Sequence, residues 1–372
     1  MARGMAGGAD VVVLGGGVVG LSAARALAAE GARVLVVERG RVGEEASGAA
    51  AGMLTAQAGA AAGSRLLETA LLARARHAAL ALELEQETGI AVERSAHGVL
   101  EVAFTESEEA ALRDRAAWQR ARGLSVETLS GGDLREAEPN LNPAVRSGLF
   151  FADDRRVDNV RLVRALAASA VARGASLLCG RPVTSLVLEG GRVAGVWAGP
   201  ERLLAPVVVN ATGAWAGLLP GDPQPPPVEP VRGHIVAFDL TPGLLRHVVC
   251  SHRGYLVPRG DGRLLAGSTV ERAGFDKSVT AGALQAVLAI ALEIAPKLAD
   301  VRIAESWAGL RPGTPDGLPV VGKGAVEGLV HAAGLFRNGI LLGPLLGEAA
   351  ARLALGRDPG IDLSAFAPSR FA

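Results

Sequence analysis

Apolar runs and a helix-like stretch alternate at the start of the chain. Residues 10–14 read Asp-Val-Val-Val-Leu, and residues 34–37 are again continuously apolar. Runs of this length are typical of buried strands, and the alanine- and leucine-rich residues 21–29 between them are typical of a helix. The pattern therefore predicts a strand–helix–strand unit whose second strand ends at Glu38.

The rest of the chain mixes helical and strand patterns. Apolar periodicity predicts helices over 64–86, 107–122 (with Ser107 in a capping-box-like position at its start), 130–139, 157–173, 280–298 and 340–355. Strands are expected within 90–104 and over 148–151, 175–178, 182–189, 192–198, 207–210, 234–238, 255–258, 264–267, 301–307, 320–321 and 329–333. Gly190-Gly191 reads as a hairpin turn, residues 221–230 as a proline-rich crossing between domains, and residues 308–317 as a turn-rich loop.

The order of these patterns indicates two domains. A chain of 372 residues exceeds what one hydrophobic core usually holds. Strand–helix patterns occupy three separated pieces, whereas antiparallel patterns lie between them. We expect an α/β fold: a Rossmann-like nucleotide domain (1–86, 148–217 and 305–372) with an inserted α+β, mostly antiparallel substrate domain (87–147 and 218–304).

Charge and composition narrow the functional class. Lysine plus arginine equals aspartate plus glutamate at 38 each, so the net charge is zero, which argues against a nucleic-acid binder. Cys179 and Cys250 form no CxxC pair, and the six histidines show no metal spacing. We expect no metal, no membrane span, no signal peptide in the first residues and a cytoplasmic location. The sequon at Asn210 ends an apolar strand, so we expect it to be buried.

The turn between the first strand and helix carries a dinucleotide-binding pattern. Gly15 permits the tight turn, Gly17 lets a pyrophosphate approach the backbone, and Gly20 lets the helix pack on the sheet. The helix start offers free N–H groups to phosphates. Glu38 is placed to accept from ribose hydroxyls and to disfavour a 2′-phosphate. A chance glycine turn is the alternative; the two strands, the helix and the acid in register argue against it and favour a nucleotide-binding turn.

Two further stretches lack side-chain bulk. Residues 46–52 are almost all alanine, glycine and serine, which suits backbone lying against a flat ligand; a flexible linker is the alternative. The apolar strand 207–210 ends in Ala-Thr-Gly213, a second place where backbone can meet a nucleotide.

Several motifs in order resemble the D-amino-acid oxidase family of flavoproteins, and within it the glycine oxidases. They are Gly15-x-Gly17-x-x-Gly20, Ala46-Ser-Gly-Ala-Ala-Ala-Gly-Met53, Tyr255-Leu-Val-Pro-Arg259, Trp307-Ala-Gly-Leu-Arg311-Pro-Gly-Thr and Phe336-Arg-Asn-Gly-Ile-Leu-Leu342. The resemblance spans essentially the whole chain. The last two blocks are the specific ones, because the glycine motif alone fits any nucleotide fold.

The resemblance implies noncovalent FAD, since neither cysteine lies in the C-terminal flavin block. The implied cofactor-binding residues are Gly15, Gly17, Val18, Val19, Gly20, Glu38, Arg39, Ala46, Ser47, Ala51, Gly52, Met53, Val183, Gly213, Leu335, Phe336, Arg337, Asn338, Gly339, Ile340 and Leu341. N–H groups near Gly339 and Ile340, at a helix start, are suited to stabilise negative charge on a reduced flavin.

The implied reaction is oxidation of glycine, sarcosine or small D-amino acids with O₂ as acceptor. The flavin does the chemistry, so no catalytic base is required and none stands out. A substrate carboxylate favours a bidentate arginine, and Arg311, expected in a rigid loop before Pro312, is the candidate; a surface arginine is the alternative. By resemblance, Tyr255 and Arg337 join it. Met53 and Val270 are expected at the substrate edge.

Some features depart from the resembling family or leave other functions open. Leu335 and Val270 differ from the residues common at those positions, which bears on substrate size. The resemblance also implies a homotetramer. The competing readings are a dehydrogenase that passes electrons to a quinone, a flavin-binding subunit without its own turnover, and an NAD-binding regulator, which would explain only the first forty residues.

Overall fold

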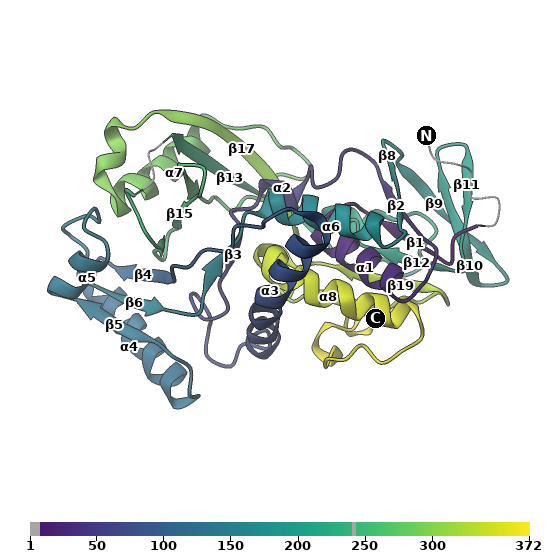
Figure 1. Ribbon diagram of the computed structural model, residues 1–372, viewed down its shortest axis with the longest axis horizontal. Coiled ribbons are helices and arrows are strands. Elements are labelled where there is room, and N and C mark those ends of the chain that lie inside the picture. Colours follow the sequence, from purple (N-terminus) through teal and green to yellow (C-terminus); the bar gives the residue numbers. More distant parts are fainter. Residues whose placement is uncertain (1–7, 240–242) are drawn as a thin grey trace.

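The computed structural model describes residues 8–239 and 243–372 (Figure 1). The predicted absence of a signal peptide concerns mainly residues 1–7, which lie outside the described part. No helix in the described part is long and apolar enough to cross a membrane.

A six-stranded sheet forms the centre of the nucleotide half. In spatial order its strands are β18 (Val320–Lys323), β19 (Leu329–Ala333), β12 (Val207–Asn210), β1 (Val11–Leu14), β2 (Val34–Glu38) and β8 (Ser176–Cys179). All pairs are parallel except β18–β19. The apolar run of β1 is explained by burial on both faces: Val11 and Val13 join the core under the helices, whereas Val12 and Leu14 join the core on the opposite face.

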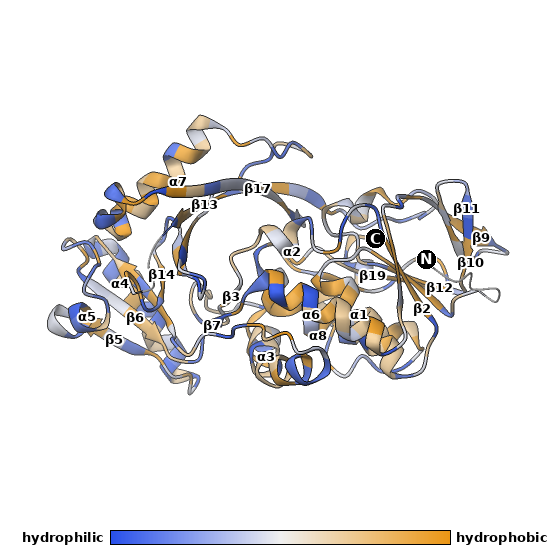
Figure 2. Ribbon diagram, turned by 45° about the horizontal axis from the view of Figure 1, so that its top comes forward, coloured by the Kyte–Doolittle hydropathy of each residue, from blue (hydrophilic) through white to orange (hydrophobic). Residues whose placement is uncertain are grey.

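Helices and a small sheet cover the two faces of this central sheet. The helices are α1 (Val18–Ala29), α3 (Leu67–Thr88), α6 (Asn159–Ala172) and α8 (Gly339–Ala354). The small sheet consists of β9 (Val183–Glu189), β10 (Arg192–Ala198) and β11 (Glu201–Leu204). Figure 2 shows hydrophobic residues concentrated on α1 and the neighbouring strands. Gly190 and Gly191 both have positive φ, as the expected β9–β10 hairpin turn requires.

An eight-stranded sheet forms the other half, at the left of Figure 1. Its order is β17 (Ile303–Gly313), β13 (Glu229–Asp239), β16 (Arg263–Gly267), β15 (Tyr255–Pro258), β14 (Val248–Cys250), β4 (Val99–Ala103), β6 (Ser147–Phe151) and β5 (Glu127–Ser130). Only β14–β4 is parallel. The mixed α/β fold with a mostly antiparallel second sheet is therefore as expected.

The remaining helices, strands and turns complete the described chain. They are α2 (Ala46–Ala49), α4 (Glu106–Ala121), α5 (Gly131–Ala137), α7 (Ala281–Ile294), the pair β3 (Met53–Leu54) and β7 (Arg155–Arg156), and the 3₁₀ turns Gly213–Leu218, Pro296–Asp300, Phe336–Asn338, Ser364–Phe366 and Pro368–Phe371. Helix α7 packs against the outer face of the eight-stranded sheet.

Two local predictions need correction. The expected loop at 308–317 begins as strand, because β17 pairs with β13 as far as Gly313. The start of α4 is capped by Thr105, whose hydroxyl accepts from the N–H of Glu108, rather than by Ser107. Residues 46–49 form the short helix α2, which argues against the alternative of a flexible linker for this stretch.

The expected domain division stays a prediction, but two of its boundaries separate strands from the sheet in which they pair. Strands β6 and β17 hydrogen-bond within the eight-stranded sheet, whereas boundaries at 148 and 305 assign them mainly to the nucleotide domain. Pairing with strands from distant parts of the chain places β6 and β17 in the eight-stranded sheet. A single sequence does not reveal such pairing.

Helices α1 and α8 approach each other closely. A Cβ on Gly343 would lie 2.7 Å from Cγ1 of Val18, and one on Gly347 would lie 2.6 Å from the carbonyl oxygen of Val19. Both distances are too short for a side chain, so glycine is required at both positions. The close packing brings the N-terminal ends of the two helices to the same cavity.

A buried histidine supplies a hydrogen-bond donor that is missing in the first turns of α8. Pro344 lies inside this helix and has no N–H, so the carbonyl of Ile340 lacks its usual partner four residues later. Nε2 of His77, on α3, lies 2.9 Å from that oxygen and 3.0 Å from the carbonyl oxygen of Leu341. Both partners are acceptors, so Nε2 carries the proton. Burial lowers the pKa of His77 to about 4.

This pKa makes stability depend on pH. Between pH 6.5 and 4 the unfolded chain protonates His77 and the folded chain does not, so stability falls as pH falls through this window. Relative to pH 8, the loss from this residue at pH 5 is about 2 kcal/mol. Urea denaturation of wild type and His77→Gln should show a smaller acid-induced loss in the variant. His97→Gln, at an exposed position, is the control; equal losses in wild type and His77→Gln would contradict the assignment.

Candidate functional site

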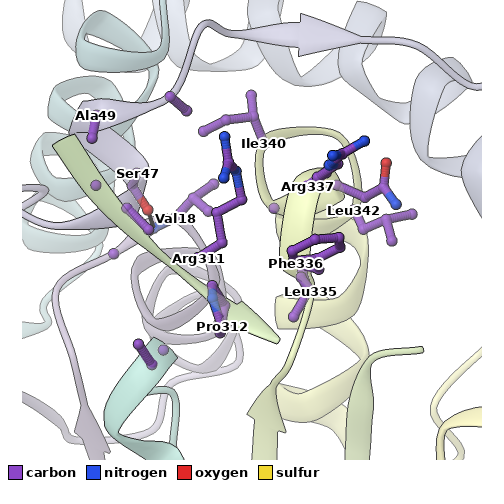
Figure 3. Close-up of a pocket in the computed structure, with 18 of the residues that line it drawn as sticks. Val18, Ser47, Ala49, Arg311, Pro312, Leu335, Phe336, Arg337, Ile340 and Leu342 are labelled. Atoms are coloured by element: carbon purple, nitrogen blue, oxygen red, sulfur yellow. Dashed lines mark hydrogen bonds between the residues drawn. The ribbon is translucent and has the colours of Figure 1, made fainter. Parts of the chain in front are cut away.

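One continuous cavity of about 820 Å³ runs between the two sheets. It begins at the carboxyl ends of β1 and β12, passes α2 and the start of α8, and reaches the face of the eight-stranded sheet at β13, β15 and β17. Figure 3 shows part of its lining, including Val18, Ser47, Arg311 and Arg337. The volume is within the roughly 300–1,000 Å³ range of ligand pockets.

The glycine-rich turn forms one end of this cavity. Gly15 has φ +103°, and a Cβ there would lie 2.5 Å from the carbonyl oxygen of Ala211. A Cβ on Gly20 would collide with the carbonyl of Gly15, so Gly20 serves helix packing, as expected. Ser47 belongs to α2 and contacts the start of α1, where its Oγ accepts from the N–H of Val18 at 3.0 Å. The open helix start suits an anion.

Glu38 lies beside this turn. Its Oε2 accepts from the N–H of Gly16 at 2.7 Å and its Oε1 from the N–H of Gly40 at 2.8 Å, so the carboxylate is fixed at the cavity wall. Arg39 pairs with Glu45 at 2.6 Å and lies 3.5 Å from the ring centroid of Trp215. These groups make a polar rim next to an aromatic surface.

Asn210 explains why the chain turns at the end of β12. Its side chain is fully buried, donates to the carbonyl of Ala216 at 3.0 Å and accepts from the Thr212 hydroxyl at 2.7 Å. The expected burial of the sequon is confirmed. The bonds also shape the turn at Gly213, which lines the cavity.

Arg311 lies at the other end, on β17 rather than in the expected loop. Nη2 donates to Oγ of Ser268 at 2.7 Å, and Nη1 donates to the carbonyl of Thr269 at 3.1 Å. Burial lowers the pKa of Arg311, and nearby Tyr255 opposes this shift. The guanidinium is partly buried, faces the cavity and pairs with no carboxylate of the described residues, so it is suited to an anionic ligand.

Arg337 belongs to the 3₁₀ turn that precedes α8. Figure 3 shows Arg311 and Arg337 facing the same space from the strand and from this turn. Gly339 and Ile340, at the start of α8, also line the cavity, so the N–H groups of that helix end are close to it.

A buried network holds the segment 46–53 between the two sheets. Arg259, at the end of β15, pairs with Asp158 at 2.6 Å and donates to the carbonyl of Ala51 at 3.2 Å. Asn159 donates to the carbonyls of Ser47 and Gly48 at 2.8 and 2.9 Å. The sequence interpretation gave none of these three residues a role, although Arg259 ends one of the quoted motifs.

The cavity collects most of the residues that the sequence singled out. Those that line it are Gly15, Gly17, Val18, Val19, Glu38, Arg39, Ala46, Ser47, Ala51, Gly52, Met53, Val183, Gly213, Tyr255, Arg311, Leu335, Phe336, Arg337, Asn338, Gly339 and Ile340. Their contacts with a bound cofactor or substrate stay predictions. Glu101, Cys250 and Ser268 line the cavity as well and were not singled out.

Three expected site residues do not line it. Val270 is 49 % exposed and lies outside the lining, so its place at the substrate edge stays a prediction. Leu341 is 2 % exposed and belongs to the core under the helices, and its neighbour Leu342 lines the cavity instead. Gly20 acts through packing alone. Within the described residues, no cluster of three or more potential metal ligands occurs.

Comparisons with known proteins find a matching family, similar sequences and a similar crystal structure. Residues 10–353 match the family described as FAD dependent oxidoreductase (DAO). The chain is 36 % identical over 364 residues to glycine oxidase from Pseudomonas putida, covering 96 % of this chain and 98 % of that protein. It is 34 % identical to the bifunctional protein ThiO/ThiG from Synechocystis, covering 97 % of this chain and 54 % of that one. The crystal structure of glycine oxidase from Geobacillus kaustophilus superposes with a TM-score of 0.93 at 36 % identity, covering 97 % of this chain and 98 % of that one.

The residues present fit FAD. The bulk-free turn at Gly17 and the start of α1 suit its pyrophosphate, the fixed carboxylate of Glu38 suits ribose hydroxyls, and the start of α8 suits the electron-rich end of a flavin ring. The long cavity joins these places without a break.

Removing the Glu38 carboxylate should weaken FAD binding. A hydrogen bond to a charged group contributes about 1.5–3 kcal/mol, so we expect Glu38→Ala to raise the dissociation constant of FAD by about 10- to 100-fold. Titration of the apoprotein, followed by quenching of FAD fluorescence, measures it. Glu85→Ala, on the exposed side of α3, is the control; unchanged affinity in Glu38→Ala would exclude the ribose contact.

Proposed function

This chain belongs to the family of FAD-dependent oxidoreductases, and we propose that it oxidises glycine with O₂ as electron acceptor. Glycine, water and O₂ would give glyoxylate, ammonia and hydrogen peroxide. The proposal is supported by the glycine oxidases to which the chain is similar over almost its whole length. The observation that carries it is the meeting of Arg311, Tyr255 and the glycine-rich turn on one cavity.

Each group of the chain has a limited task in this reaction. Bound FAD supplies the redox chemistry by accepting a hydride equivalent from the carbon that bears the amine. Arg311 holds the substrate carboxylate through its guanidinium, and the Tyr255 hydroxyl donates to the same carboxylate. Arg337 adds positive charge to that space. Met53 and the small residues before it leave room for the substrate and limit its size.

The start of α8 contributes electrostatically. Its N–H groups and its positive helix end face the cavity at Gly339 and Ile340, where they would stabilise negative charge that develops on the cofactor. Proton removal needs no dedicated base, because an amino acid that enters with a neutral amine can lose its α-hydrogen as hydride. The proposed catalytic set therefore contains no general base.

Oxygen use, product fate and assembly belong to the same proposal. Sarcosine and small D-amino acids are further proposed substrates, and the imine product would serve thiazole synthesis. We propose a homotetramer in the cytoplasm, which light scattering on the purified protein tests. A dehydrogenase that passes electrons to a quinone is the alternative; the oxidase is favoured because glycine oxidases from Pseudomonas putida and Geobacillus kaustophilus are each 36 % identical to this chain.

An anaerobic absorbance titration tests the function. Bleaching of the yellow flavin band by glycine, followed by its return with hydrogen peroxide on admission of air, is the expected result. Bleaching without prompt return in air would favour the dehydrogenase. A band indifferent to glycine, sarcosine and D-alanine would contradict the proposed substrates.

Removal of the guanidinium should impair substrate binding rather than cofactor binding. Arg311→Met loses a charge-assisted contact of roughly 2–5 kcal/mol. We expect KM for glycine to rise at least 30-fold, which corresponds to about 2 kcal/mol, while the flavin absorbance per protein stays constant. Arg302→Met, at an exposed arginine before the same strand, is the control. An unchanged KM in Arg311→Met would rule out the carboxylate role.

A further inference from the structure

Arg311 and Tyr255 reach each other across two intervening strands. In the eight-stranded sheet the order is β17, β13, β16, β15, with Arg311 on the first and Tyr255 on the last. Their side chains must therefore lie along the sheet surface rather than stand away from it. That arrangement is possible only where the strands between them leave the surface free.

Both intervening strands carry glycine at the place where a long side chain crosses. A Cβ on Gly233, in β13, would overlap Cζ, Nη1 and Nη2 of Arg311. A Cβ on Gly267, in β16, would lie 2.6 Å from Oη and 2.7 Å from Cζ of Tyr255. Real Cβ atoms essentially never come within 3.0 Å of another atom in this way. Each glycine thus lies directly beneath one of the two functional groups.

Backbone conformation does not account for these glycines. Neither Gly233 nor Gly267 is among the residues with positive φ, so the φ angle requires glycine at neither position. Glycine inside a strand weakens it, because it packs no side chain and loses more entropy on folding. A benefit elsewhere is needed to explain glycine at both positions, and close approach of another group is one of the few that strands offer.

The register places the two crossings side by side. Gly267 is paired with Tyr255 on one side and with Ile235 on the other, and Gly233 lies two residues before Ile235 on the same face of β13. Ser268, next to Gly267, accepts from Nη2 of Arg311 at 2.7 Å. The Tyr255 ring and the Arg311 guanidinium therefore converge from opposite directions on the end of β16.

We infer that Gly233 and Gly267 are positioning residues for substrate recognition: their missing side chains let Arg311 and Tyr255 lie flat and converge into one carboxylate-binding site. The inference rests on the proposed function of that site. The three atoms nearest to a Cβ at position 233 all belong to the Arg311 guanidinium, so an alanine there displaces the flexible end of that side chain. It should spare the fold and the cofactor site and weaken carboxylate binding.

The test uses the purified flavoprotein and two ligands, glycine and acetate. Acetate carries only the carboxylate, and its binding is read from the flavin absorbance. For Gly233→Ala we expect a rise of at least tenfold in KM for glycine and in the dissociation constant of acetate, with unchanged FAD content and melting temperature. Gly282→Ala is the matched control, because a Cβ there meets nothing within 4 Å; it should behave as wild type.

A double-variant cycle separates this role from general structural damage. In an Arg311→Ala background no guanidinium remains to be displaced, so adding Gly233→Ala should change acetate affinity less than twofold. An equal loss in both backgrounds, or wild-type acetate affinity in Gly233→Ala, would overturn the inference. If Gly233→Ala does not fold, folding of the double variant supports the inference and its failure to fold overturns it.

Gly267→Ala with Tyr255→Ala forms the parallel cycle and should follow the same pattern. Acetate binding does not require turnover. A protein that ignores glycine but whose acetate affinity follows the cycle would therefore contradict the proposed substrate alone, whereas normal glycine oxidation with no cycle effect would contradict only the positioning role.

Discussion

The buried pair between Arg259 and Asp158 is the contact on which the arrangement of the cavity depends. Arg259 directly follows β15 of the eight-stranded sheet, and Asp158 caps the start of α6 beside the six-stranded sheet. A buried charge is tolerated only when it is paired and hydrogen-bonded. The guanidinium meets that requirement with groups from the other half of the molecule, including the carbonyl of Ala51. The two halves are thereby fixed at a distance that leaves room for a flat ligand between them.

Small residues shape the cavity between the two halves that the Arg259–Asp158 pair holds together. Gly343 and Gly347 bring α8 onto α1, and Gly309 lies against Ala49 so that β17 can approach α2. Gly233 and Gly267 leave the sheet surface free beneath two long side chains. The same physical reason applies at each place: without a Cβ, backbone or a functional group comes closer than any other residue allows. The chain thus exchanges strand and helix propensity for close approach around the cavity.

The sequence predicted the nucleotide half better than the substrate half. Glycines and an acid at fixed spacing within about forty residues carry a local signal, so the turn at Gly15 and the place of Glu38 could be anticipated. Arg311 was identified as a functional candidate, but its strand was read as a loop, because Gly and Pro near it suggested a turn and pairing with β13 was invisible. Arg259 was noticed in a motif without a role, since its partners lie about 100 and 200 residues away. Val270 was placed at the site by resemblance alone, and it lies outside the cavity lining.

By itself, the sequence determined the elements, the dinucleotide turn and the kind of chemistry, because each depends on residues close together in the chain or on motifs in a fixed order. Tertiary structure alone decided which strands pair, that His77 completes the helix turn broken by Pro344, and that Arg311 and Tyr255 meet across Gly233 and Gly267. These features depend on distances between residues far apart in the chain. No pattern along the sequence encodes such distances; they appear only when the sheets form and the side chains pack.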